Sequence, residues 1–363
     1  MSEDLSHPLD ASDELSADAS DDFAVVTRIG HGRLTLRRFF RNKLAVFGLC
    51  GLALLILLAI FGPMLTGWDY LEIDKRAFLK APSSSHWLGT TRTGRDVLAL
   101  TLHGMSRSLI IGFVAATLST LLSSTVGTTS AYFGGWVERV LLWVTDLMLI
   151  VPSLLIIGVT MRGGLSGNMA WVALAFMLGL FGWMTTGRVV RSLTLSLKNR
   201  EYVLAAKYMG LPAWRIIIRH ILPNISSLMI VDLTLGVGYA VLGETGLSFL
   251  GLGVQAPDTS LGTLIGEGAQ MAVTYSWIFL SPAAVLVFLV FCINAIGDGI
   301  RDALDPSSQS GGAVGRKLRK GKGSAEKQRA DAAGVSAGLP GGTGEAGGIV
   351  IMEDSATQGG GSQ

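Results

Sequence analysis

Residues 201–224 read EYVLAAKYMGLPAWRIIIRHILPN and lie between two long apolar runs. The first half contains helix-forming residues and no helix breaker. Gly210 supplies a C-terminal stop for that helix, and Pro212 suits the first turn of a second one. The pattern predicts a helical hairpin outside the bilayer, with helices at 201–209 and 212–221, and Pro223 ending the second.

The second predicted helix mixes large apolar side chains with cationic ones. Its large apolar residues are Trp214, Ile217, Ile218 and Ile221, and they alternate with Arg215, Arg219 and His220. Apolar groups at an exposed bend are better explained by a partner protein than by a solvated surface.

Composition predicts that the chain is a polytopic membrane protein. The 363 residues are 49% hydrophobic and 15% charged, and the mean hydropathy is +0.49. An ordinary soluble domain is less apolar. Cys50 and Cys292 lie inside apolar runs, too far from His or other Cys for metal-ligand spacing, so no disulfide framework or zinc site is expected.

Six segments are long and apolar enough for a spanning helix of roughly 20 residues. The expected fold is therefore all-α and polytopic. The segments are residues 44–65, 108–131, 140–161, 169–187, 225–243 and 275–297.

Lys and Arg near the span ends predict the orientation. Basic residues cluster before the first span, at Arg33, Arg37, Arg38, Arg41 and Lys43, and again in 188–223, so both regions are expected in the cytoplasm. Residues 244–274 contain no Lys or Arg and are expected outside, while the basic C-terminal tail returns inside. The long acidic N-terminus does not fit a cleavable signal peptide.

The chain divides into four predicted parts. Residues 1–32 are an acidic, disordered segment, and 33–107 hold the first span and an extracytoplasmic loop. Residues 108–306 form a core of five spans with a cytoplasmic loop at 201–223. Residues 307–363 are a disordered, Gly-rich, basic tail, since neither end can bury enough apolar surface to offset chain entropy.

Sequence motifs for catalysis or nucleotide binding are missing. The segment nearest to a P-loop, GRKLRKGKGS at 315–324, has the wrong spacing and does not follow a predicted strand. There is no H-E-x-x-H or G-x-S-x-G motif. If nucleotide drives transport, another chain must bind it, and no cofactor is expected here.

Two acidic residues lie within predicted spans. Asp146 and Asp232 could line a substrate or ion pathway, or could pair with protein groups within kinked helices. In the second span, small residues recur every fourth position from Ala115 through Ser119 and Ser123 to Ala131. Such a groove either packs another helix closely or lines a path. A proton-coupled carrier would show more intramembrane charges and an inverted repeat.

The hairpin resembles a known motif. AAKYMG followed by ILP, with Ala205, Ala206, Gly210, Leu222 and Pro223, looks like the EAA motif of bacterial ABC importer permeases. In that family the motif forms a coupling helix that docks into a cleft on the ATPase subunit. This sequence departs from the motif at two positions, since Leu204 stands where the motif has Glu and His220 where it has Ile.

Four further segments extend the resemblance over about residues 33–306. The chain is similar to the C-type permease of dipeptide and oligopeptide importers, in the peptide/nickel permease family. Thr91 replaces an Asp that is usual in that family. The matching segments are 86–112, 146–155, 244–262 and 297–306.

This resemblance implies a type I ABC importer permease fold and an assembly with several partners. They are a B-type permease, two ATPase subunits that bind ATP and Mg²⁺, and an extracytoplasmic binding protein. The chain would be a multi-pass protein of the bacterial cytoplasmic (inner) membrane with both termini inside, working by alternating access.

The same resemblance assigns candidate residues. The expected ATPase contacts are Glu201, Ala205, Ala206, Lys207, Gly210, Leu211, Pro212, Ala213, Trp214 and Arg215. The expected outer surface facing the binding protein contains Trp87, Gly89, Arg95, Asp96, Glu244, Ser248 and Phe249. Candidate pathway or packing residues are Ser119, Ser123, Asp146 and Asp232.

The cargo stays open at this point. Peptides are expected, with nickel, glutathione or a haem-like ligand as alternatives in the same family. An ion-coupled secondary carrier would move substrate without an ATPase, and a membrane scaffold would assemble with partners without transporting. The ligand of the neighbouring binding protein would discriminate most of these.

Overall fold

The computed structural model describes residues 31–162 and 168–304, which are helical apart from their connections. Within these ranges there is no β-strand beyond a single bridge between Thr90 and Asp96, so the predicted all-α class is confirmed. The segments predicted to be disordered, residues 307–363 and, except for residues 31–32, residues 1–32, lie outside the described residues.

The helix bounds are α2 (His31–Arg41), α3 (Lys43–Thr66), α4 (Val97–Phe133), α5 (Gly135–Ile150), α6 (Ser153–Arg162), α7 (Asn168–Gly182) and α8 (Met184–Leu197). They continue with α9 (Glu201–Tyr208), α10 (Ala213–Ile216), the π-helix η1 (Ile217–Ile221), α11 (Leu222–Phe249), α12 (Leu261–Ala269) and α13 (Ser276–Leu304).

Up to six of these elements can cross a membrane by length and composition. Four are continuous helices, namely α3, α4, the run from α10 to α11, and α13. Two are bent pairs, α5 with α6 at 71° and α7 with α8 at 42°. Each of the six apolar segments expected from the sequence falls on one of these spans.

The bend between α5 and α6 has a local cause. Val151 precedes Pro152 and has an extended backbone, with φ −72° and ψ 125°. A proline disfavours the helical conformation in the residue before it and cannot donate a backbone hydrogen bond. The apolar run therefore breaks at Pro152 and resumes at Ser153 in a new direction.

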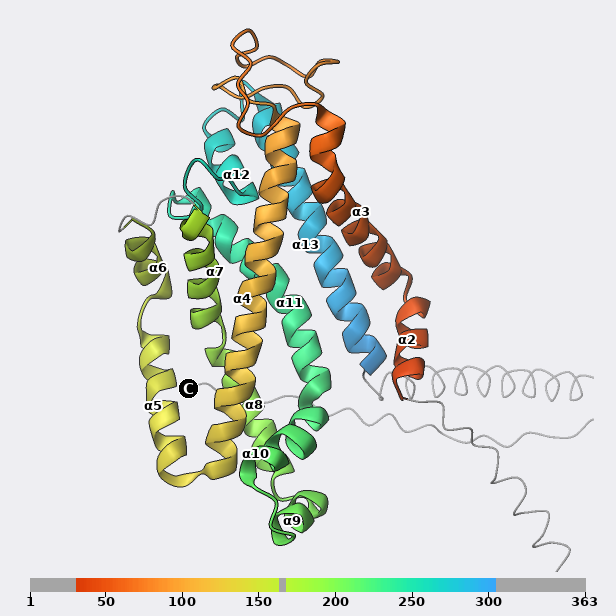
Figure 1. The fold of residues 1–363 in the computed structure, drawn as a ribbon, viewed down its shortest axis with the longest axis vertical. Coiled ribbons are helices and arrows are strands. Elements are labelled where there is room, and N and C mark those ends of the chain that lie inside the picture. The colour runs from red at the N-terminus through yellow and green to blue at the C-terminus, as the bar shows by residue number, and fades with distance from the viewer. Residues whose placement is uncertain (1–30, 163–167, 305–363) are drawn as a thin grey trace, which may run out of the picture. The chain divides into compact units, whose positions relative to one another are not determined.

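Helix α4 lies at the centre of the helical core and packs against α11, α8, α7 and α3 (Figure 1). One buried cluster joins it to α11, α12 and α13 through side chains that include Met105, Val241, Leu261 and Leu289. Close approach depends on small residues. A Cβ on Gly127 would lie 2.7 Å from the Gly187 carbonyl oxygen of α8, so this crossing requires glycine.

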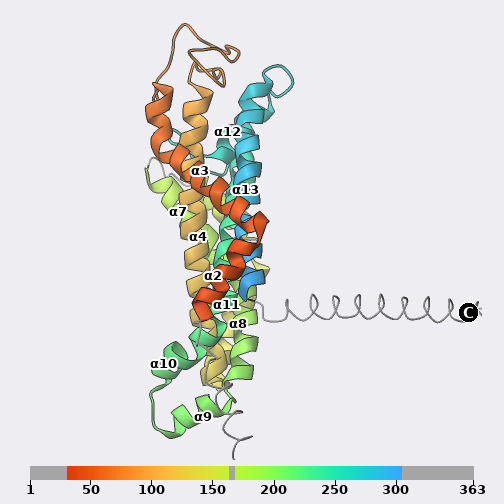
Figure 2. The same cartoon turned by 90° about the vertical axis from the view of Figure 1, so that its right-hand side faces the viewer.

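Both ends of the helical core carry irregular or short elements. Figures 1 and 2 show the 67–96 loop and α12 toward one end, and α9 and α10 at the other. Helix α13 packs against α3 and α2 along its length. The two ends are therefore separated by the length of the spanning helices.

The structure corrects the start of the second span. α4 begins at Val97, well before the expected residue 108, because the Asp96 side chain caps it by accepting from the Ala99 N–H at 2.8 Å. Its first turns carry His103 and Arg107, which favoured a loop in the sequence. Both contact Asp258, so these polar side chains have a partner within the fold.

The structure also corrects the role of Pro223, which does not end the hairpin's second helix. The chain passes from α10 through η1 into α11, with Pro223 in the first turn of α11. In the π-helix the Leu222 N–H bonds to the Ile217 carbonyl, five residues back. The helical register has already shifted there, which allows the proline to be accommodated without a break.

The span expected at 225–243 runs on through residues 244–249 as part of α11, and a short helix, α12, forms between the last two spans. Ser260 caps α12 by accepting from the Thr263 N–H at 3.2 Å. This short helix packs against α11, α13 and α4.

Candidate functional site

The backbone between α9 and α10 makes a tight bend. α9 is followed by Gly210 in the left-handed region, with φ +76°, where glycine carries no steric cost. The Leu211 N–H closes the turn by donating to the Ala206 carbonyl at 3.2 Å. Pro212 then has an extended backbone and precedes α10 as its N-cap, one position earlier than the expected first turn.

The inner side of this bend packs against its own chain. Val203, Ala206, Ile216 and Ile221 form a buried cluster, with Tyr132 of α4 among the side chains packed on it. Ala206 is 1% exposed, so the expectation that it contacts a partner is wrong. It instead lets α9 approach the rest of the hairpin closely, because a larger side chain would have to displace this cluster.

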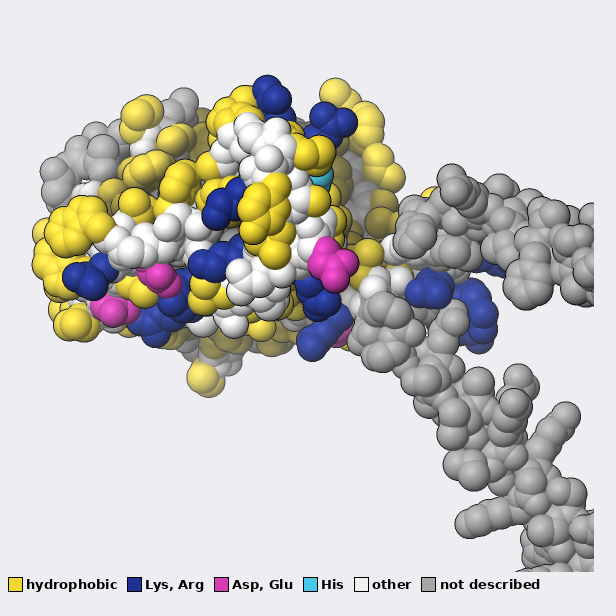
Figure 3. Space-filling model, turned by 90° about the horizontal axis from the view of Figure 1, so that it is seen from below, with side chains coloured by type: hydrophobic (Ala, Val, Ile, Leu, Met, Phe, Trp, Pro, Cys, Tyr) yellow, Lys and Arg dark blue, Asp and Glu magenta, His cyan; other side chains and the backbone are white. Residues whose placement is uncertain are grey.

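The outer side of the bend exposes large apolar side chains. We call Tyr208, Met209, Trp214 and Ile218 the bend patch, with exposed fractions of 86%, 73%, 60% and 57%. Figure 3 shows hydrophobic side chains at this end with Lys and Arg around them. The Arg215 guanidinium lies 5.3 Å from the Trp214 ring centroid. A patch with a cationic rim is typical of a protein-binding surface.

Most of the residues predicted for this surface reach solvent. Leu211 and Ala213 are half-buried, and the exposed ones are Glu201, Ala205, Lys207, Gly210, Pro212, Trp214 and Arg215. The prediction omitted Tyr208, Met209 and Ile218. In the sequence, Tyr208 and Met209 could have been found as the apolar pair directly before the helix stop at Gly210.

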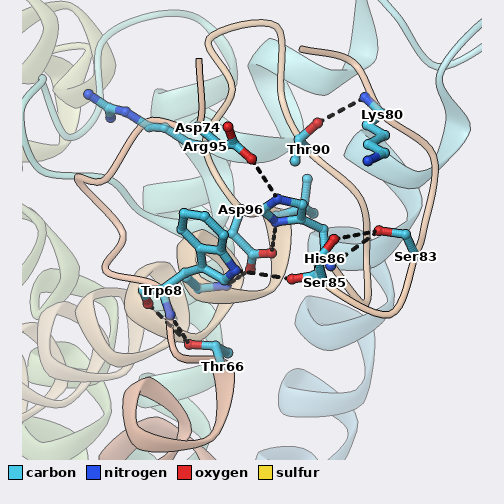
Figure 4. Close-up of polar contacts among 12 residues, drawn as sticks. Thr66, Trp68, Asp74, Lys80, Ser83, Ser85, His86, Thr90, Arg95 and Asp96 are labelled. Carbon is cyan, nitrogen blue, oxygen red and sulfur yellow. Dashed lines mark hydrogen bonds and ion pairs between the residues drawn. The ribbon is translucent and has the colours of Figure 1, made fainter. Parts of the chain in front are cut away.

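At the opposite end, the 67–96 loop is organised around a buried histidine (Figure 4). His86 is 1% exposed, and its Nδ1 lies 2.9 Å from Asp96 Oδ2. Its Nε2 lies 3.5 Å from Asp74 Oδ2. The Trp68 ring covers the imidazole at 4.7 Å between centroids and donates from Nε1 to the Ser85 carbonyl. His86 thus joins distant parts of the loop to the start of α4.

This arrangement corrects two surface assignments in the loop. Asp96 is 3% exposed and caps α4, and Gly89 is buried, with a Cβ there falling 2.7 Å from the Lys80 carbonyl oxygen. Trp87, at 61% exposed, does face solvent, and Arg95 is half-buried. Gly89 and Asp96 therefore support the loop and leave the surface to their neighbours.

The Asp74 carboxyl makes the loop sensitive to acid. The Arg76 backbone N–H donates to Asp74 Oδ1 at 2.8 Å and lowers the pKa of that carboxyl, with burial opposing and His86 adding to the effect. Because the folded pKa is the lower one, this stabilisation is complete above the unfolded pKa of about 4 and is lost as the pH falls through the folded pKa. We expect limited proteolysis within 67–96 to accelerate below about pH 4.

In the Asp74→Asn variant, proteolysis of the 67–96 loop should accelerate less at acidic pH than in the unchanged chain, when cleavage is followed across the pH range. Asp69→Asn is the matched control, since Asp69 lies in the same loop and accepts from the Leu71 N–H without contacting His86. Identical pH profiles for Asp74→Asn and the unchanged chain would contradict the role of Asp74.

A second cluster connects this end to the spans. Asp258 Oδ1 accepts from Arg107 Nε at 3.2 Å and lies 2.7 Å from His103 Nε2. The Tyr70 ring stacks on His103 at 3.6 Å, and the Arg107 guanidinium lies 5.2 Å from the Trp171 ring centroid. The cluster joins the 67–96 loop, α4, the segment before α12, and α7.

Glu244 lies in a third polar cluster and is fully buried. Its Oε1 accepts from the hydroxyls of Ser248 at 2.6 Å and Ser260 at 2.5 Å, and its Oε2 accepts from Ser108 at 3.0 Å. The cluster ties α11 to α4 and to the cap of α12. The expectation that Glu244 and Ser248 face a partner is therefore wrong, whereas Phe249 is 56% exposed.

Between these ends, α4, α6, α7, α8 and α11 line a partly open cavity of about 430 Å³. Asp232 lies on its wall, and its Oδ1 accepts from Thr186 at 2.8 Å while its Oδ2 accepts from Thr120 at 3.2 Å. We call it the central cavity. Its polar lining residues are Ser119, Thr120, Ser153, Thr185, Thr186 and Asp232.

The four candidate pathway residues separate in the structure. Ser119 and Asp232 line the central cavity. Ser123 is buried and donates to the Thr120 carbonyl, in the part of α4 that packs against α8. Asp146 lies on α5, is exposed, and pairs with Arg188 of α8 at 2.5 Å. The small-residue stripe therefore lines the central cavity in one part and packs against α8 in the other, and its place in a transport path stays a prediction.

Comparison with known proteins identifies the family. Residues 119–309 match the family model of the binding-protein-dependent transport system inner membrane component. Residues 31–82 match the N-terminal TM domain of oligopeptide transport permease C. The chain belongs to this family of transport permeases.

Curated relatives extend over most of the permease. It is 49% identical to the oligopeptide transport system permease protein OppC of Mycobacterium tuberculosis over 278 residues, 76% of this chain and 95% of that protein. It is 38% identical to the dipeptide transport system permease protein DppC of Alkalihalophilus pseudofirmus, over 78% of this chain and 92% of the relative. The oligopeptide transport system permease protein OppC of Bacillus subtilis is also 38% identical, over 74% of this chain and 87% of that protein.

Among solved structures, the permease is similar to an inward-facing form of the MetNI methionine ABC transporter. The TM-score is 0.45 at 18% identity, covering 57% of this chain and 97% of that one. The family assignment rests on the sequence matches, and it makes the permease a multi-pass membrane component of a transport system rather than an enzyme.

Proposed function

We propose that the permease is the C-type subunit of an ABC importer that translocates dipeptides and oligopeptides delivered by an extracytoplasmic binding protein. The names of the relatives support this cargo, because OppC and DppC proteins belong to oligopeptide and dipeptide transport systems. The family description itself specifies dependence on a binding protein. The observation that carries the proposal is the bend patch, which offers an exposed apolar surface to a partner.

We further propose that two ATPase subunits, which bind ATP and Mg²⁺, act on the permease, and that one of them docks on the bend patch. A related B-type permease completes the membrane part. The rigid cluster beneath the patch supports this, because Val203, Ala206 and Ile216 fix the outer side chains to the chain's own core. A preorganised surface loses less conformational entropy when a partner docks.

The bend end is proposed to face the cytoplasm of a bacterial inner membrane, with both termini on that side. Lys and Arg around the bend support this orientation (Figure 3), because cytoplasmic segments carry an excess of these residues. The 67–96 loop would then lie outside. The candidates for contact with the binding protein on that side remain Trp87 and Arg95 of the loop and Phe249 of α11, which are exposed or half-buried.

Helix geometry connects the proposed docking site to the transport path. The run from Ala213 to Phe249 passes from the bend patch to the Asp232 wall and then to Glu244. A movement imposed on α10 by an ATPase would be transmitted along this run. The central cavity would open alternately to the two sides as the ATPase pair closes and separates, which is an alternating-access mechanism.

Reconstitution tests the proposed function. The permease, its B-type partner, both ATPases and the binding protein are placed in proteoliposomes, and uptake of a radiolabelled tripeptide is measured with and without ATP. We expect uptake that requires ATP and the binding protein. Import of nickel, glutathione or haem in place of peptide would reassign the cargo. Uptake driven by an ion gradient without the ATPases would indicate a secondary carrier.

A further inference from the structure

The central cavity contains a carboxylate without a cationic partner. Among residues 31–162 and 168–304, no Lys, Arg or His lies within ion-pair distance of Asp232. Each of its oxygens accepts one threonine hydroxyl. A carboxylate offers about four acceptor sites, so Asp232 retains capacity for further donors on the cavity side.

The position of Asp232 makes this remaining capacity significant. It lies in the interior part of α11, away from both helix ends. Charged residues at such depth are costly unless they meet a partner or a water-filled cavity. The Thr120 and Thr186 hydroxyls hold the carboxylate on the wall, which fixes its direction without neutralising its charge.

The remaining walls suit an amphipathic ligand. Ser119, Ser153 and Thr185 supply further hydroxyls, while Phe181, Leu178 and Tyr239 supply apolar and aromatic surface. Ligand sites usually combine an apolar lining with a few placed polar groups, and the volume of about 430 Å³ lies in their range. The cavity therefore favours a ligand with one cationic donor group and variable apolar parts.

We propose that the central cavity is a transit site in which Asp232 receives the protonated α-amino group of the passing peptide. An ammonium has three donors, which can reach Asp232 and the hydroxyls beside it. The two threonine bonds already occupy part of the carboxylate, so the peptide is oriented there without being trapped. This inference rests on the proposed peptide-import function.

The first test measures occupancy of the cavity directly. Ser153→Cys is introduced into the detergent-solubilised complex without binding protein or ATP, and maleimide labelling of the new cysteine is followed. The unchanged permease, which keeps Ser153, gives the background labelling of Cys50 and Cys292. A tripeptide should protect this position at concentrations about tenfold lower than its N-acetylated form, as expected for loss of a charged hydrogen bond. Equal protection by the two peptides, or no protection, would overturn the proposal.

The second test measures transport. Asp232→Asn should lower tripeptide uptake about tenfold relative to the unchanged complex. Asp298→Asn is the matched control, because it makes the same change on an exposed residue of α13 that does not line the cavity. Uptake by Asp232→Asn equal to that of the control would overturn the proposal.

The two levels of inference fail differently. If the unchanged complex imports no peptide, the proposed function fails. If it imports peptide and Asp232→Asn imports equally well, the function stands and only the transit site is wrong. Should Asp232→Asn fail to assemble, the labelling comparison decides the matter on the native carboxylate.

Discussion

Met209→Glu should reduce ATP-driven peptide uptake by at least about tenfold while leaving the permease folded and assembled in the membrane. Met209 is 73% exposed in the bend patch, so a charged side chain there stays hydrated in the free permease. On docking, the same carboxylate would lose its water against an apolar surface without a matched partner. Uptake and binding-protein-stimulated ATPase activity are measured in proteoliposomes.

Asn199→Glu is the matched control for this substitution. It adds the same charge at an exposed position before α9, outside the bend patch, and should leave uptake near normal. Normal uptake and normal ATPase stimulation with Met209→Glu would show that the bend patch does not carry the coupling contact.

Gly210 provides an independent probe of the same surface. A Cβ at this position meets nothing within 4 Å, so a bulky side chain would project into the partner rather than into the permease. Gly210→Trp should therefore block coupling, with roughly 1–2 kcal/mol of backbone strain from the positive φ. Gly210→Asn tests the strain separately, because asparagine tolerates this conformation. If Gly210→Trp couples normally, docking at the bend is wrong.

Glu244→Ala should destabilise the assembled permease by about 1–3 kcal/mol or more, because the serine hydroxyls around the carboxylate lose their common acceptor inside the fold. Glu244→Gln should also destabilise, since its amide presents donors where Ser108, Ser248 and Ser260 already donate. The measurement is the thermal midpoint of the detergent-solubilised complex, read from the fraction that elutes as intact complex after heating.

Glu267→Gln controls for the loss of a glutamate near this region. Glu267 lies on α12 and is exposed, so its replacement should leave the midpoint unchanged. A midpoint for Glu244→Ala as high as that of the control would mean that the cluster does not hold α11, α4 and α12 together.

Local sequence patterns were sufficient to predict the spans and the bend. A spanning helix requires a run of apolar side chains long enough to cross the hydrocarbon, and each such run is read within one segment. The turn at Gly210 likewise depends on a backbone preference of one residue. For the same reason the exposed Trp214 and the cation beside it were predictable from a single stretch.

Burial within the candidate surfaces could not be predicted in this way. Ala206 looked like a contact residue, yet it lies on the buried face of α9, and Asp96 and Glu244 looked exposed, yet each is enclosed. Some of the contacts that enclose polar groups join distant parts of the chain. Glu244 bonds to Ser108, which is 136 residues away, and the pairing of Arg107 with Asp258 joins residues 151 apart.

The sequence by itself determined that the permease crosses a membrane as helices and presents a glycine bend between two of them, because hydrophobic length and turn chemistry are properties of short segments. Only the tertiary structure decided which polar groups face the surface, a cavity or the core. A carboxylate becomes a structural link or a candidate ligand site through the neighbours that helix packing brings to it. For Glu244 these are serine hydroxyls that enclose it, and for Asp232 they are threonines that leave one side open to the cavity.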